Sequence, residues 1–226
     1  MNSTKKHILA LVGMVSLCCG VMLLVDGVLR PDYWIKSMAK VTLFLLCPLV
    51  YSRIDRDFQP KQFFAVSRNG LLPALGLGFG VFAFIMAAYW VFSKLGDFSA
   101  ITGLLEENIG VDKDNFLWVA VYISFVNSLL EEFFFRGFAF FTLKPLTGRA
   151  FAYGFSALVF AVYHTAMMLG WWDWWLFALA LAGLFVGGLS FDFLNEWTGT
   201  IWCSWMVHMF ANFAINTVGC ILFGIL

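Results

Sequence analysis

Charged residues are scarce in this chain, and neither sign of charge dominates. Only 12% of the 226 residues are charged and 62% are hydrophobic, whereas charged residues make up about a quarter of a typical soluble domain. The 14 basic and 14 acidic residues cancel, and the sequence has no basic stripe of the kind that binds nucleic acid. The composition therefore predicts a membrane protein and excludes a nucleic-acid partner.

The sequence also lacks the pattern of a disulfide-bonded protein. Its 5 cysteines are odd in number, lie within apolar runs and include no CxxC pair. Small secreted domains held together by disulfides usually carry an even number of cysteines. We interpret these cysteines as small buried hydrophobic residues.

Long apolar runs are the main positive feature of the sequence. A helix needs about 20 mostly apolar residues to cross the hydrocarbon core of a bilayer. Runs of this kind occupy residues 8–29, 33–51, 71–93, 115–143, 150–170, 174–193 and 200–224. The second run is the weakest, because it contains Lys36 and Lys40. The predicted fold class is an all-α, polytopic transmembrane helical bundle of about seven spans.

Basic residues in the short loops predict the orientation of the bundle. The segment between the second and third spans contains Arg53, Arg56, Lys61 and Arg68, whereas the loop at 94–114 is mainly acidic. Cytoplasmic loops are enriched in lysine and arginine. We therefore expect a multi-pass protein of the cell membrane with its N-terminus on the cytoplasmic side.

Three clusters of polar residues lie inside the predicted spans, where charged groups are costly. They comprise Glu131, Glu132 and Arg136 in the fourth span, His164 in the fifth, and His208 and Asn212 in the last. Glu132 precedes Arg136 by four residues, the favourable order for an ion pair on one helix, whereas Glu131 points in another direction. With a rise of about 1.5 Å per residue, the clusters reach similar depths, so we expect them to meet.

Such a cluster has the groups needed to hydrolyse an amide bond with water. A buried carboxylate beside a histidine can act as a general base, and a second histidine with an asparagine amide can donate hydrogen bonds to an oxyanion. A G-x-S-x-G elbow, a pair of buried aspartates and an H-E-x-x-H motif are all missing from these spans. Glu131, His164 and His208 as three zinc ligands remain an alternative.

The motifs E-E-x-x-x-R at 131–136, F-x-x-x-H at 160–164 and H-x-x-x-N at 208–212 occur in this order on separate predicted spans. Together they resemble the CPBP family, the CAAX proteases and bacteriocin-processing (Abi) membrane proteins, over about residues 115–216. The resemblance implies an intramembrane glutamic protease. It also implies that Glu131 and His164 activate the water and that His208 and Asn212 form the oxyanion hole. Glu132 and Arg136 would then be supporting residues.

The resemblance also implies how the chain is divided and what it acts on. We expect N-terminal membrane helices at residues 1–114 and a CPBP-like catalytic helical core at residues 115–226. The expected partners are the lipid bilayer and a peptide or membrane-protein substrate, and no cofactor is expected unless the protease depends on zinc. A non-catalytic immunity or scaffold protein is the main alternative. A proton-coupled transporter is a further one, although no inverted repeat is visible.

Overall fold

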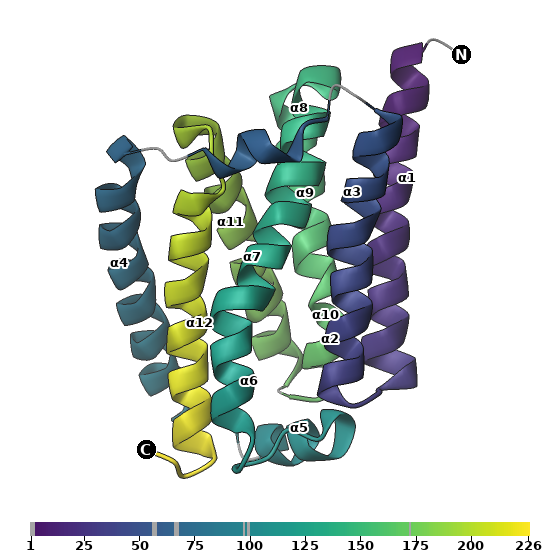
Figure 1. Ribbon diagram of the computed structural model, residues 1–226. Coiled ribbons are helices and arrows are strands. Elements are labelled where there is room, and N and C mark those ends of the chain that lie inside the picture. The colour runs from purple at the N-terminus through teal and green to yellow at the C-terminus, as the bar shows by residue number, and fades with distance from the viewer. Residues whose placement is uncertain (1–2, 56–57, 66–67, 97, 99, 172) are drawn as a thin grey trace.

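Long helices arranged side by side make up the described part of the protein, a computed structural model covering residues 3–55, 58–65, 68–96, 98, 100–171 and 173–226 (Figure 1). Within these residues, seven helical segments are long and apolar enough to cross a membrane. They are Thr4–Leu29, Tyr33–Ile54, Asn69–Phe92, Phe116–Thr147, Arg149–Met168, Trp174–Thr198 and Trp202–Leu222. The predicted helical bundle of about seven spans is confirmed. Arg56, which contributes to the predicted orientation, lies outside the described residues.

Some spans are single helices and others combine several helical elements. The single helices are α4 (Arg68–Phe92), α11 (Trp174–Thr198) and α12 (Trp202–Leu222). The first span joins α1 (Ser3–Leu24) to η1 (Val25–Leu29), and the second joins α2 (Tyr33–Val41), η2 (Thr42–Leu46) and α3 (Cys47–Ile54). The fourth span joins α6 (Phe116–Tyr122), η4 (Ile123–Asn127), α7 (Ser128–Glu131), η5 (Glu132–Phe140) and α8 (Phe141–Thr147). The fifth span joins α9 (Arg149–Tyr163) to α10 (Thr165–Met168). In the part of the chain that the structure describes, two short helices lie outside the spans, η3 (Pro60–Phe64) and α5 (Ala100–Ile109).

The sixth span continues beyond the end at residue 193 that its apolar run predicts. Helix α11 extends to Thr198 and ends at Gly199, whose backbone is left-handed with φ of 72°. This conformation is common at helix ends and favours glycine. Glu196 belongs to the added turn, where its carboxylate contacts Lys144 at 2.9 Å and Arg149 at 2.8 Å. These ion pairs allow a polar turn to extend an apolar helix.

The fourth span lies at the centre of the bundle. Every residue of η5, from Glu132 to Phe140, is buried, and aromatic rings fill the space around it. The rings of Phe44 and Phe134 stack with their centroids 4.1 Å apart, which joins the second span to the fourth. In Figure 1, α4 packs against α12 at one side of the bundle, and α5 lies across the end opposite the N-terminus. The polar clusters of the fourth span therefore face other helices.

Candidate active site

Glu131 is the last residue of α7, in the middle of the fourth span. The helix changes to π-helical turns on both sides of α7, in η4 and η5, and such turns within longer helices often mark functional sites. The side chain of Glu131 is only 1% exposed. A carboxylate at this depth needs partners that compensate its charge.

One oxygen of the Glu131 carboxylate is held by three donors. Oε1 accepts hydrogen bonds from Asn127 Nδ2 at 2.8 Å, Tyr163 Oη at 2.8 Å and Lys40 Nζ at 3.3 Å. Asn127 lies one turn earlier on the same span, whereas Lys40 and Tyr163 come from the second and fifth spans. The three donors therefore hold the Glu131 carboxylate in one orientation.

The other oxygen of Glu131 faces the two histidines of the predicted site. Oε2 lies 3.6 Å from His164 Nε2 and 3.8 Å from His208 Nε2. These separations are longer than a direct hydrogen bond of about 2.7–3.2 Å. Among the described residues, no group forms a hydrogen bond with this buried oxygen. The structure thus brings Glu131, His164 and His208 together around one unshared carboxylate oxygen.

Each histidine is oriented through its second ring nitrogen. His164 Nδ1 lies 2.7 Å from the carbonyl oxygen of Phe160. Because a carbonyl only accepts hydrogen bonds, Nδ1 carries the proton and Nε2 faces Glu131. His208 Nδ1 lies 2.9 Å from Glu132 Oε1. This pairing of histidine with a carboxylate orients the ring in many catalytic sites.

Glu132 and Arg136 belong to a second buried network that joins the fourth, fifth and sixth spans. Arg136 Nη1 lies 3.3 Å from Glu132 Oε1, and Arg136 Nε lies 3.5 Å from Asp192 Oδ1. Ser156 Oγ donates to the same oxygen of Asp192 at 3.0 Å. All three charged side chains are 0% exposed. Because Glu132 Oε1 contacts both Arg136 and His208 Nδ1, this network also helps to orient the His208 ring.

Asn212 lies close to this site but its amide is engaged elsewhere. It is one helical turn beyond His208 on α12, and its Nδ2 donates to the carbonyl oxygen of Ile123 at 3.2 Å. Within the described part of the chain, no hydrogen bond joins Asn212 to Glu131, His164 or His208. The structure thus places the amide against the π-helical backbone of η4.

Sequence reasoning missed several residues of the site. Lys40, Tyr163 and Asn127 bind Glu131 directly. Asp192 pairs with Arg136. None of these four residues is among the predicted site residues. Some signals were present in the sequence, since Lys40 interrupts an apolar run and Asp192 is a lone aspartate in the sixth span. For Tyr163, the only indication in the sequence of a place in the site is its position next to His164.

The described residues also bear on whether this site holds a metal ion. Among the described residues, no group of three or more histidine, cysteine, aspartate or glutamate side chains is arranged to hold one. The absence of a cofactor stays a prediction.

Comparison with known families supports the resemblance drawn from the motifs. Residues 113–214 match the model of the Rce1-like family, described as type II CAAX prenyl endopeptidase Rce1-like. The matched segment contains the three motifs and Asp192, whereas Lys40 lies outside it. No curated protein and no solved structure matches the chain. The family supports a CAAX-type protease that works within a membrane.

Proposed function

Because residues 113–214 match the model of the Rce1-like family, we propose that this chain is an intramembrane endopeptidase of the glutamic type. Water is the nucleophile, Glu131 with His164 activates it, and His208 with Asn212 stabilises the oxyanion. The family match supports peptidase activity, and the geometry around Glu131 supports this particular division of roles.

The observation that carries the proposal is the asymmetry of the Glu131 carboxylate. Oε1 is held by three donors, while Oε2 has none among the described groups and faces the Nε2 atoms of His164 and His208. A carboxylate that served only as a structural ion-pair partner would gain from engaging both oxygens. An oxygen directed at two histidines is instead available to accept a proton from water.

The proposed reaction moves one proton around Glu131. A water molecule bound between Oε2 and His164 Nε2 attacks the carbonyl carbon of the scissile bond, and Oε2 takes its proton. The carbonyl oxygen becomes negative as the new carbon–oxygen bond forms. The carbonyl double bond then re-forms as the carbon–nitrogen bond breaks, and Glu131 passes its proton to the leaving nitrogen. Glu131 returns to its ionised form, so the cycle needs no other reactant.

His208 is well placed to receive the oxyanion. Its Nδ1 is held by Glu132, and its Nε2 is directed toward Oε2 of Glu131. A donor on Nε2 then faces the region of the attacked carbonyl. Asn212 adds a second donor only if its amide turns away from the Ile123 carbonyl, and substrate binding would provide the competing acceptor.

The substrate is proposed to be a peptide or a membrane-protein segment. The side chains beside the cluster are largely aromatic, including Phe160 and Phe191, which lie against His208. Apolar surroundings suit a segment that enters from the bilayer, and they exclude bulk water from the reaction. We also propose that the N-terminus is cytoplasmic and that the host is the cell membrane.

The decisive experiment compares Glu131→Gln with wild type in lipid vesicles that contain a membrane proteome. Released peptides are identified and quantified by mass spectrometry. Glu196→Gln is the matched control, because Glu196 pairs with Lys144 and Arg149 at the end of α11. Loss of a general base lowers the rate by about 10²–10⁴-fold, so Glu131→Gln is expected to lose nearly all release while the control keeps it.

The outcome separates this function from its rivals. Full peptide release by correctly inserted Glu131→Gln protein would contradict glutamic catalysis. Biological activity retained by that variant without any proteolysis would favour an immunity or scaffold protein. Activity that is lost to a chelator and restored by zinc would favour a zinc-dependent protease.

A further inference from the structure

Among the described residues, Lys40 is the one lysine or arginine that contacts Glu131. It belongs to α2 in the second span, outside the segment that matches the Rce1-like family. Its Nζ lies 2.7 Å from Asn127 Oδ1 and 3.3 Å from Glu131 Oε1, and 5.0 Å from the centre of the Tyr163 ring. The lysine is only 6% exposed, so the bundle buries a full positive charge beside the proposed base.

The contacts of Lys40 determine how Asn127 is oriented. A lysine ammonium only donates hydrogen bonds, so Asn127 must present its carbonyl oxygen to Lys40. The amide nitrogen of Asn127 is then directed toward Glu131, where it donates to Oε1 at 2.8 Å. Lys40, Asn127 and Glu131 therefore form a closed triangle of contacts. Removing the ammonium would free the amide to flip and would leave the carboxylate without its nearest cation.

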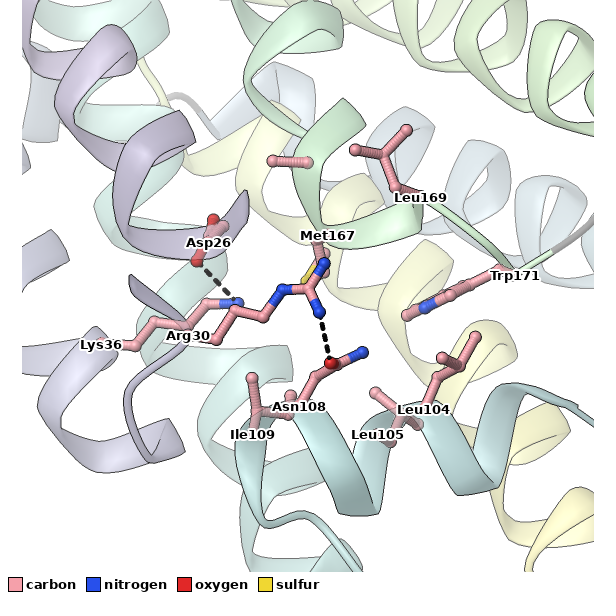
Figure 2. Close-up of a pocket in the computed structure, with 11 residues that line it drawn as sticks. Asp26, Arg30, Lys36, Leu104, Leu105, Asn108, Ile109, Met167, Leu169 and Trp171 are labelled. Atoms are coloured by element: carbon pink, nitrogen blue, oxygen red, sulfur yellow. Dashed lines mark hydrogen bonds and ion pairs between the residues drawn. The ribbon is translucent and has the colours of Figure 1, made fainter. Parts of the chain in front are cut away.

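The second span is itself held in place one turn away from Lys40. Lys36 lies four residues earlier on the same face of α2, and its Nζ contacts Asp26 at 2.9 Å (Figure 2). Arg30, in the connection between the first two spans, donates to Asn108 of α5 at 2.9 Å. Figure 2 shows both contacts at the pocket that these residues line. They connect the loop end of the second span to the first span and to α5, and neither contact involves Lys40, Asn127 or Glu131.

We propose that Lys40 is a positioning residue for the proposed hydrolysis, which makes the N-terminal half of the chain part of the active site. The ammonium engages Oε1 directly and through Asn127, so that Glu131 offers only Oε2 to water. This inference rests on the proposed function. It extends the site to a span that the family match does not include.

The kinetic test uses Lys40→Met, which keeps most of the length of the side chain without its charge. Rates are normalised to correctly folded protein. We expect kcat to fall at least tenfold while KM changes less than twofold, because the lysine contacts the base and not the substrate. The control is the double variant Asp26→Asn, Lys36→Met, which removes the neighbouring ion pair of α2 and is expected to keep kcat within twofold. An unchanged kcat in Lys40→Met, or an equal loss in the control, would overturn the proposal.

A second measurement needs no activity. The midpoint of unfolding in denaturing detergent is compared for Lys40→Met, for Glu131→Gln and for the variant that combines these two substitutions. If the two side chains form a pair, Lys40→Met lowers the midpoint strongly when Glu131 is present and much less in the Glu131→Gln background. Equal shifts in both backgrounds would contradict the pairing. Wild-type protein that hydrolyses nothing would end the proposed function, whereas normal hydrolysis with an inactive Glu131→Gln and a fully active Lys40→Met would end this inference alone.

Discussion

Replacing Arg136 with methionine tests whether the second buried network stabilises the bundle. Arg136 is 0% exposed, and its guanidinium group contacts Glu132 at 3.3 Å and Asp192 at 3.5 Å. The guanidinium carbon also lies 4.2 Å from the centre of the Phe160 ring. Methionine fills much of the same space without a charge. The variant therefore leaves two carboxylates in the interior with no cation between them.

The expected loss follows from those contacts. Removing one partner of a buried ion pair costs about 3–5 kcal/mol, and a desolvated cation–π contact adds about 2 kcal/mol or more. Since folded domains are stable by only about 5–15 kcal/mol, we expect Arg136→Met to lose a large part of the stability. The triple variant with Glu132→Gln and Asp192→Asn should recover most of it, because no buried charge is then left unpaired.

The assay is reversible unfolding of the purified protein in mixed micelles with increasing denaturing detergent, followed by circular dichroism. Wild type, Arg136→Met and the triple variant are compared under the same conditions. A loss below about 1 kcal/mol in Arg136→Met would refute the reasoning, since it is far less than a broken buried pair costs. A triple variant less stable than the single variant would refute it as well.

Two further predictions use matched pairs of neighbouring residues. Gly188→Ala would place a Cβ 2.9 Å from Ala157 Cα, whereas a Cβ at Gly187 meets nothing within 4 Å. Overpacking costs about 1–3 kcal/mol, so in detergent unfolding Gly188→Ala should be less stable than the matched variant Gly187→Ala. Equal stability of these two variants would contradict close packing of α11 on α9. Asn212→Ala should lower kcat by about 10²-fold if its amide acts as an oxyanion donor. Asn216→Ala removes a similar amide bonded to the Ala120 carbonyl and Ser124 and should keep kcat within twofold, so equal losses in peptide-release assays would argue against the role of Asn212.

The spans of this protein could be predicted from hydropathy because bilayer thickness sets their length. The prediction of about seven spans is confirmed. Their ends were less predictable, since the turn that contains Glu196 depends on ion pairs with Lys144 and Arg149 from other parts of the chain. The π-helical turns around Glu131 also left no signal in the sequence. The division at residue 114 stays a prediction.

Contacts within one helix were accessible from spacing alone. Residues four apart lie on the same face of a helix, and Glu132 with Arg136 and Asn127 with Glu131 do form contacts of this kind. The sequence also indicated that Glu131, His164 and His208 share a depth in the membrane. Their catalytic roles remain proposals.

What only the tertiary structure decided is which helix faces which. Lys40 reaches Glu131 across 91 positions of the chain, and Asp192 meets Arg136 from another span. Apolar helix surfaces in a bilayer do not by themselves define a partner, so rotation and register depend on how side chains such as Phe44 and Phe134 pack. The sequence by itself determined the spans and the pairs within each helix, whereas the packing between helices placed a lysine against the proposed base.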